Sequence, residues 1–420
     1  MVWMNIPVTL KTVFNKLKTH KDIVFLALAL AIVALSLFRL PEGEQKHTKA
    51  REVPVLVFAH WWEGKDAILE NLKNEFRELH PDIEIRFEFR PYDELRKALR
   101  AESAGEAIAR PMAADIVAMD PLWFPEFKVR EKIEAEEFAL LKFFHPLFYN
   151  IDILKRAGFS RPPKTWSEFL TQARAVSAPE AGRYGMALAL GPDNFRGLYR
   201  DIYSWLWAGG IRLADLQKPL SNNRTPAEVR FLTEVLTFLS SLHREKTLFP
   251  KTFSLTEEEK RTAFLEGSLA FMIGSAEDIE NLRRAMGEGS VGYTSIPVPD
   301  TYSGKPIFGS GGWSLAITRE SAYKDEARGF IEFLIEQSSR LAEGWAIPEH
   351  GNHNEPHDSF YSKAWELYIT GDLIREFSGI KRDELEINSL DTIFREELIN
   401  LFEGRTGAPD AAGKIYNRLQ

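Results

Sequence analysis

The chain has 420 residues, of which 44% are hydrophobic and 27% are charged, and its formal net charge is −8. This balance is typical of globular proteins with sizeable apolar cores, and the length indicates two or three domains. The acidic balance argues against a nucleic-acid-binding surface. The sequence has no cysteine, which excludes disulfides, thiolate metal ligands, cysteine catalysis and lipid attachment through cysteine.

An uninterrupted apolar run occupies residues 23–38, with lysines before it and polar residues after it. The run is at the short end for a membrane-spanning helix and at the long end for a signal-peptide core. Because no good cleavage site follows it, we predict an uncleaved transmembrane signal anchor at 22–40. This places 1–21 in the cytoplasm and 41–420 on the extracytoplasmic side, periplasmic or extracellular. Cleavage as a signal peptide is the alternative. The polar stretch 41–51 is expected to form a tether.

The stretch VPVLVFAHWWE at 53–63 combines a strand with a polar and aromatic end. Its apolar run is typical of a strand that is buried on both faces, and helical spacing follows it. The residues at the end of the strand are His60, Trp61, Trp62 and Glu63. In open α/β sheets this edge binds ligands. Indoles pack against the C–H face of a sugar ring while polar groups bind its hydroxyls, so the loop favours a carbohydrate. Alternatively, one indole belongs to the core.

Strands and helices alternate after this loop. Residues 83–89 alternate apolar and charged side chains, which predicts a strand, and 92–109 has helical spacing. The apolar stretch DIVAM at 115–119 predicts a third strand, which ends at Asp120. This alternation indicates a doubly wound α/β arrangement, with Asp120 at the same sheet edge as 60–63. A helix N-cap or turn residue is the alternative role for Asp120.

The rest of the chain continues with helices and strands. Thr165 and Glu168 form a capping-box pattern, which predicts a helix start. Ser275 and Glu277 follow the end of an apolar strand. Further helices are expected at 195–208, 225–244, 256–265 and 325–336, and strands at 184–190, 269–273, 291–298 and within 307–318.

Four stretches carry a family resemblance. They are FRELHPDIEIRFE, PLFYNIDILKRAGFSRPPKTWSEFL, AFLEGSLAFMIGSA, and VGYTSIPVPD followed by GSGGWSLAITRESAYKDEARGFIEFL. In this order the chain resembles the extracellular solute-binding proteins of ABC-type sugar importers, the family that includes maltodextrin-binding proteins. The second stretch matches the family pattern YN…L…AG…P.TW.EF and is the most specific. The resemblance covers 53–420. The chain departs from the family in lacking a lipidated cysteine and a GK.YG.P phrase between Asp120 and Tyr149.

The resemblance implies a periplasmic-binding-protein-like α/β fold with two doubly wound α/β lobes and a hinged cleft that holds the ligand. The first lobe is expected at 52–147 and 294–340, and the second at 148–293 and 341–420. The resemblance implies binding and not catalysis, and we expect no cofactor. We also expect a monomer that contacts the subunits of a permease.

The residues expected to face the cleft belong to both lobes. They are His60, Trp61, Trp62, Glu63, Asp120, Gly311, Gly312 and Trp313 of the first lobe, and Tyr149, Trp207, Ser275 and Glu277 of the second. By the resemblance, carboxylates take hydroxyl pairs and indoles stack on the pyranose faces. Glu63, Asp120 and Glu277 are therefore expected to accept hydroxyls. Gly311 and Gly312 would let a ligand approach the backbone, with a strained turn as the alternative.

Other tryptophans need to be weighed against these. Trp205 and Trp207 are two residues apart on a helix and cannot point the same way, so we prefer Trp207 for the cleft and Trp205 for the core. Trp345 is expected either to cap the cleft or to join the core. Trp123 and Trp166 are assigned to packing.

The loop EHGNHNEPH contains His350, His353 and His357. Three histidines at such spacing resemble a zinc site only loosely, because the spacing is not that of a strong zinc motif. Polar residues also collect in loops for other reasons, so we expect no metal site.

The leading hypothesis is a membrane-tethered receptor that captures a carbohydrate, an oligosaccharide by preference, for an ABC importer. A glycosidase-like enzyme is the first alternative, because Asp120 and Glu277 from opposite lobes would supply the two carboxylates about 5–10 Å apart that it needs. A binding protein for a polyamine, a metal such as ferric ion, or a phosphorylated polyol is the second. A sensor or scaffold that keeps the fold is the third.

Overall fold

The computed structural model describes residues 53–100, 113–192, 194, 196–216, 227–350, 359–374 and 384–419. The predicted cytoplasmic segment, signal anchor and tether lie outside these residues, as do His353 and His357. Residues Pro54–Gln420 form one compact unit, and both apolar cores of the described residues draw on this unit alone. Within the described ranges, no helix is both long enough and apolar enough to cross a bilayer.

The larger of two sheets has seven strands in the order β10-β4-β9-β3-β1-β2, with β11 paired to β9 off this path. The strands are β1 (Val55–His60), β2 (Glu84–Phe89), β3 (Ile116–Met119), β4 (Phe138–Phe144), β9 (Ile307–Ile317), β10 (Ile347–Pro348) and β11 (Asp372–Ile374). β1 runs parallel to β2 and β3, whereas β9 runs antiparallel to β3 and β4. The sheet is therefore mixed. Its central strands are almost wholly buried, which explains their continuous apolar sequences.

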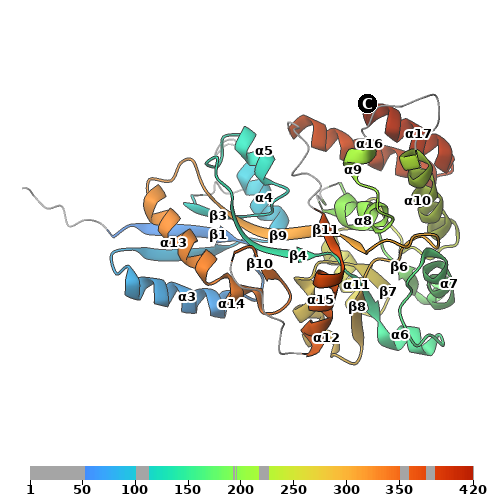
Figure 1. The fold of residues 1–420 in the computed structure, drawn as a ribbon, viewed down its shortest axis with the longest axis horizontal. Coiled ribbons are helices and arrows are strands. Elements are labelled where there is room, and N and C mark those ends of the chain that lie inside the picture. The colour runs from blue at the N-terminus through green and yellow to red at the C-terminus, as the bar shows by residue number, and fades with distance from the viewer. Residues whose placement is uncertain are drawn as a thin grey trace, which may run out of the picture. The chain divides into compact units, whose positions relative to one another are not determined.

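Helices cover both faces of the larger sheet (Figure 1). They are α3 (Asp66–Leu79), α4 (Tyr92–Arg100), α5 (Phe124–Val129), α13 (Lys324–Glu336) and α14 (Ser338–Ala342). In Figure 1, α4 and α5 lie on one side and α3 and α14 on the other. Phe76 of α3 packs edge-on against Phe330 of α13, with 4.9 Å between ring centroids. The amphipathic spacing of α3 thus serves to cover the sheet.

The smaller sheet has four strands in the order β6-β7-β5-β8. They are β5 (Leu147–Asn150), β6 (Tyr184–Met186), β7 (Leu269–Ile273) and β8 (Val291–Thr294). β5 is antiparallel to β7 and β8, and β6 is parallel to β7, so this sheet is also mixed.

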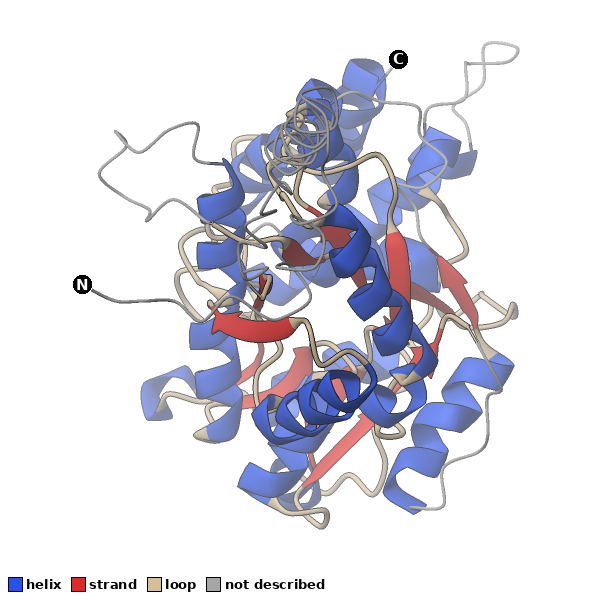
Figure 2. Cartoon of the chain, turned by 90° about the vertical axis from the view of Figure 1, so that its left-hand side faces the viewer, coloured by secondary structure: helices blue, strands red, loops and turns tan. Residues whose placement is uncertain are grey.

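Figure 2 shows the helices in blue and the strands in red from a second direction, and the remaining described helices are among them. They are α6 (Ile151–Arg156), α7 (Trp166–Val176), the 3-10 helix η1 (Pro179–Ala181), the π-helix η2 (Tyr199–Tyr203), α8 (Ser204–Ala208), α9 (Leu213–Leu216), α10 (Ala227–Arg244), α11 (Glu257–Leu265), α12 (Asp278–Met286), α15 (Ser359–Thr370), α16 (Glu384–Phe402) and α17 (Ala408–Leu419).

The chain passes between the sheets where β4 leads into β5 through His145 and Pro146, and again where β8 leads into β9. β10 pairs antiparallel with β4 and covers the edge of the larger sheet. Residues 347–348 therefore lie with the sheet of the predicted first lobe, whereas the predicted boundary assigned every residue after 340 to the second lobe.

Further elements also differ from the sequence prediction. The strand expected at 184–190 ends at Met186, because the backbone N–H of Ala189 donates to the Asp201 carboxylate (2.6 Å) and not to a neighbouring strand. The helix expected at 195–208 is a π-helix over its first described turns before α8 begins. β4 and α5 were not predicted from the sequence.

Gly311 of β9 makes room for the ring of Phe143 in β4, since a Cβ at Gly311 would lie 2.2 Å from that ring. We expect Gly311→Ala to lower the free energy of unfolding by about 1–3 kcal/mol, because the neighbouring strand has to shift. Gly329→Ala in α13 is the matched control, because a Cβ there meets nothing within 4 Å. Its free energy of unfolding should rise by up to about 1 kcal/mol through helix propensity. Urea unfolding measures the stability of both variants. Equal free energies of unfolding for Gly311→Ala and Gly329→Ala would contradict the close packing of Gly311 against Phe143.

Candidate functional site

Asp120 directly follows β3 and accepts hydrogen bonds from three residues. Its Oδ1 accepts from the backbone N–H of Leu122 (2.9 Å), and its Oδ2 accepts from the Tyr92 hydroxyl (2.8 Å) and from Arg196 Nε (2.9 Å). The carboxylate side chain is only 3% exposed. The hydrogen bond to Leu122 corresponds to the turn role that the sequence analysis gave as the alternative for Asp120. The bonds to Tyr92 and Arg196 show that the same carboxylate also faces side chains from two other parts of the chain.

Arg196 lies just before η2 and joins groups that follow strands of both sheets. Its guanidinium carbon is 3.8 Å from the centre of the Tyr92 ring, and its Nη1 is 3.6 Å from Oε2 of Glu277. Burial alone lowers the pKa of Arg196, but Tyr92, Asp120 and Glu277 outweigh it and hold that pKa well above the ordinary value. The charged guanidinium is therefore held between two carboxylates and an aromatic face.

Glu277 lies after β7 and makes longer contacts than Asp120. Its Oε2 accepts from the Ser275 hydroxyl (3.2 Å) and its Oε1 accepts from the indole N–H of Trp313 (3.4 Å). The Glu277 side chain is 21% exposed. The backbone N–H of Ser275 donates to Asp278 (2.8 Å), which fixes the turn between β7 and α12. Glu277 thus keeps capacity to accept further hydrogen bonds.

Two groups of aromatic rings flank these charges. The first aromatic group is Trp61, Tyr92 and Trp123. The second aromatic group is Trp62, Trp313 and Trp345. Trp62 stacks on Trp313 with ring centroids 4.4 Å apart and planes inclined by 10°. The indole N–H groups of Trp61, Trp62 and Trp123 are buried and have no hydrogen-bond partner among the described residues. Such donors are normally satisfied, so their concentration beside a charged cluster is a feature of binding sites.

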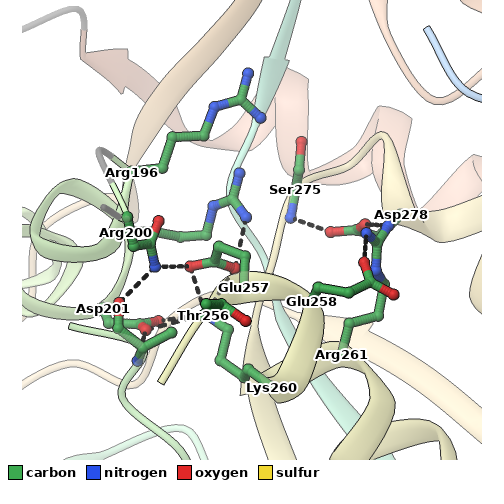
Figure 3. A network of polar contacts seen from close by, with 12 residues as sticks. Arg196, Arg200, Asp201, Thr256, Glu257, Glu258, Lys260, Arg261, Ser275 and Asp278 are labelled. Carbon is green, nitrogen blue, oxygen red and sulfur yellow. Dashed lines mark hydrogen bonds and ion pairs between the residues drawn. The ribbon is translucent and has the colours of Figure 1, made fainter. Parts of the chain in front are cut away.

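A buried ion network supports the segment that carries Arg196 (Figure 3). Lys260 of α11 binds both carboxylate oxygens of Asp201 in η2 (2.8 and 3.0 Å), and neither side chain is exposed. Glu257 accepts from Arg200 (2.9 Å) and Lys260 (3.1 Å). Burial raises the pKa of Glu257, but Lys260 and Arg200 outweigh it and lower that pKa to about 2. These contacts fix η2 to α11, and Figure 3 shows Arg196 extending away from this network.

The structure brings several of the predicted site residues together. Asp120 and Glu277 meet at Arg196, and Ser275 and Trp313 bind Glu277. Trp62 joins them by stacking on Trp313.

Trp61 and Gly312 lie next to this cluster. Trp61 contacts Tyr92 edge-on, with ring centroids 5.3 Å apart. Gly312 pairs with Lys142 in the ladder of β9 and β4, directly before Trp313. Glu63 is more peripheral, since its side chain is 68% exposed and lies 3.8 Å from Arg261.

His60 is not part of this cluster. The side chain is 1% exposed and its ring contacts Phe58, Trp62, Phe87 and Phe89. Burial lowers the pKa of His60 to about 4, with a smaller opposing effect of Asp66. These contacts place the imidazole in the aromatic core of the larger sheet.

Trp207, Tyr149 and Gly311 also have local packing contacts. Trp207 is fully buried and packs against Tyr199 (4.7 Å between centroids), while Trp205 packs in the core as predicted. Gly309 gives space to the Trp207 ring, and Gly292 gives space to the ring of Tyr149. Gly311 is an interior residue of β9 and not part of a strained turn.

Arg196 and Tyr92 belong to the cluster but were not predicted. Tyr92 begins α4, and Arg196 lies at the start of the helix expected at 195–208, so each looks like an ordinary helix residue in the sequence. The one sequence signal that could have pointed to Arg196 is an arginine between two nearby aromatic residues, Phe195 and Tyr199. Across the ranges that the structure describes, no cluster of histidine and carboxylate side chains is suited to hold a metal ion.

The family model and a related protein both place this chain among binding proteins. The family model for bacterial extracellular solute-binding proteins matches residues 61–339. A probable ABC transporter-binding protein of Deinococcus radiodurans is 28% identical over 197 residues, which is 45% of this chain and 44% of that protein. The match thus spans less than half the length of this relative.

Solved structures show the same fold. The acarbose receptor GacH of Streptomyces glaucescens has a TM-score of 0.64 at 15% identity, covering 87% of this chain and 97% of that chain. A maltose-bound protein of T. maritima has a TM-score of 0.63 at 19% identity, covering 87% of this chain and 98% of that chain. The predicted α/β fold of periplasmic binding proteins is confirmed, and it is built here on two mixed sheets.

The buried neutral His60 predicts a pH dependence of stability. Its pKa is about 4 in the folded chain and about 6.5 when unfolded, so the unfolded chain binds more protons between these values. The contribution of neutral His60 to the free energy of unfolding should therefore fall by about 2 kcal/mol from pH 7 to pH 5. We expect His60→Phe to remove this part of the loss in urea unfolding at both pH values. An equal loss of unfolding free energy between pH 7 and pH 5 in the wild type and the variant would contradict this prediction. Comparison with His145→Phe tests whether the effect belongs to His60.

Proposed function

The chain belongs to the family of bacterial extracellular solute-binding proteins, and we propose that it captures a carbohydrate, an oligosaccharide by preference, for the permease of an ABC-type importer. The observation that carries this proposal is the Asp120–Arg196–Glu277 cluster between two aromatic groups. A sugar offers hydroxyls to the carboxylates and the guanidinium, and apolar ring faces to the indoles. The buried indole N–H groups supply donors for hydroxyl oxygens.

The relatives support the ligand class. The solved structures with the same fold hold acarbose and maltose, according to their descriptions. The family is one of binding proteins and not of enzymes, which agrees with the expectation of a non-catalytic role. The geometry supports the same conclusion, because Arg196 holds the Asp120 carboxylate by two nitrogens and also approaches Glu277. A carboxylate that already accepts from Leu122, Tyr92 and Arg196 has little capacity left to approach a glycosidic oxygen.

The ligand would lie between two lobes that close around it. We place the larger sheet in the first lobe and the smaller sheet in the second, joined where β4 runs into β5 and β8 runs into β9. The proposed lobes keep the predicted limits of 52–147 with 294–340 and 148–293 with 341–420, except that β10 and β11 go with the first lobe. Arg196 comes from the second lobe and Asp120 from the first, so their contact holds the lobes together.

The proposed ligand-contacting residues come from both lobes. We retain Trp61, Trp62, Glu63, Ser275, Glu277, Gly312 and Trp313, and add Tyr92 and Arg196. Asp120 is retained as the residue that positions Arg196. Membrane attachment through the predicted signal anchor at 22–40, with 41–420 on the extracytoplasmic side, completes the proposal. A tether of about a dozen residues would reach roughly 40 Å when fully extended, enough for a receptor beside its permease.

We expect residues 41–420 to bind one class of sugar saturably, with changed tryptophan fluorescence and a raised melting temperature. Glu277→Gln replaces a charged, two-oxygen acceptor of hydroxyls by a neutral amide, and Asp120→Asn weakens the hold on Arg196, so each should weaken binding by about ten- to a hundredfold. Glu75→Gln, which breaks an exposed ion pair with Arg340, is the charge-matched control and should leave affinity unchanged.

Several outcomes of this titration contradict the proposal. A response to a polyamine, a metal or a phosphorylated polyol, with none to any sugar, would keep the fold and change the ligand class. A sugar response that neither Glu277→Gln nor Asp120→Asn affects would move the site elsewhere. No response to any compound would favour a sensor or scaffold.

Arg196→Gln tests the contact between the proposed lobes. Without the guanidinium, Asp120 and Glu277 lose their shared cation, and the unliganded protein should become more open. Small-angle X-ray scattering should then give a larger radius of gyration than for wild type. Arg328→Gln, which removes an arginine from an exposed pair with Glu136, is the control. Identical scattering of Arg196→Gln and wild type would show that the contact does not hold the lobes.

A further inference from the structure

A second cavity lies outside the candidate site, beside the ends of α10 and α16. Its volume is about 620 Å³, which is within the usual range of small-molecule pockets. It is lined by β6 and by the segment that follows α10, and none of its lining residues belongs to the Arg196 cluster or to the two aromatic groups.

The interior of this cavity is apolar and rich in rings. Phe249, Phe253 and Phe402 line it, together with Leu248. Phe402 stacks on His243, with ring centroids 4.6 Å apart and planes inclined by 12°. Rings in such an arrangement offer faces and edges to a flat aromatic or apolar ligand.

The lining of the cavity includes two lysines although the whole chain is acidic. Lys246 and Lys251 both line it, and neither has a hydrogen bond or ion pair to a carboxylate among the described residues. Lys251 only contributes weakly to lowering the pKa of Glu259. The one carboxylate in the lining is Glu403, which is already ion-paired with Arg405. The cavity therefore has two ammonium groups to offer to an anion.

The backbone holds both lysines in a conformation that residues with side chains rarely adopt. Their φ angles are 56° at Lys246 and 66° at Lys251. Between them, the carbonyl of Thr247 accepts from the backbone N–H groups of Gly185 (2.8 Å) and Met186 (3.2 Å). Lys246 occupies the position after a helix end that glycine usually takes. Lysine at strained positions beside a cavity points to a role for its side chain.

We propose that this cavity is a second binding site, for a small anion with an aromatic or apolar ring body and a carboxylate, sulfonate or phosphate group. The ring enters among Phe249, Phe253 and Phe402, and the anionic group binds Lys246 and Lys251. The proposal is independent of the carbohydrate site, because it uses other residues.

The test uses two probes that share one ring system. 8-Anilinonaphthalene-1-sulfonate carries the anionic group, and N-phenyl-1-naphthylamine lacks it. Residues 41–420 contain the whole compact unit and are titrated with each probe by fluorescence. We expect saturable binding of the sulfonate at one site, at least fivefold tighter than that of the neutral probe. Phenyl phosphate or benzoate should compete with it.

The double variant Lys246→Gly/Lys251→Gly removes both charges and is compatible with folding, because glycine adopts positive φ readily. Its affinity for the sulfonate should fall at least fivefold, while its affinity for the neutral probe, its melting temperature and its sugar binding stay as in wild type or better. Glu131→Gly, at another position of positive φ (55°), is the control and should bind the sulfonate normally. Equal affinities of the two probes for wild type, unsaturable binding, or an unchanged affinity of the double variant would overturn the proposal.

Discussion

The burial of the Arg196 guanidinium is the constraint on which the candidate site depends. A buried charge is costly unless it is paired and hydrogen-bonded, and removal of one partner of a buried pair typically costs about 3–5 kcal/mol. Arg196 meets this requirement with Asp120, Glu277 and the face of Tyr92. These partners follow β3, precede α12 and begin α4, so one side chain fixes three separate parts of the chain against each other.

The two sides of the site are held by different forces. On the side of β3, the partners rest on a sheet whose strands are buried in an apolar core. On the side of Arg196, the backbone is irregular and includes the π-helix η2, which Lys260, Asp201 and Glu257 hold by buried ion pairs. Ion pairs require correct geometry to compensate desolvation, whereas apolar packing tolerates small shifts. The position of Arg196 is therefore sensitive to the loss of a single charge.

Strand periodicity predicted much of this arrangement and explains where the structure differs from the expectation. Asp120, Ser275 and Glu277 were found because each follows a recognisable apolar strand. His60 shares the face of Phe58 two residues earlier, which places it in the core with the neighbouring rings. Trp61 and Trp62 join different aromatic groups because neighbouring residues diverge. Arg196 lies in a stretch that was expected to be helical, where an arginine looks like an ordinary surface residue, so only its three-dimensional partners reveal its role. β10 and β11 join a sheet that their distance in sequence did not indicate.

The contact lengths distinguish the roles of the two carboxylates. Asp120 is almost fully buried and already accepts from Leu122, Tyr92 and Arg196 at 2.8–2.9 Å, which leaves it little further capacity. It therefore acts by positioning Arg196. Glu277 is partly exposed and its contacts are 3.2–3.6 Å, so a ligand hydroxyl can bind it without displacing the guanidinium. A cationic ligand would have to compete with Arg196 for both carboxylates. In the proposed site, this asymmetry favours a neutral, hydroxyl-bearing ligand over a polyamine and gives the direct contact to Glu277.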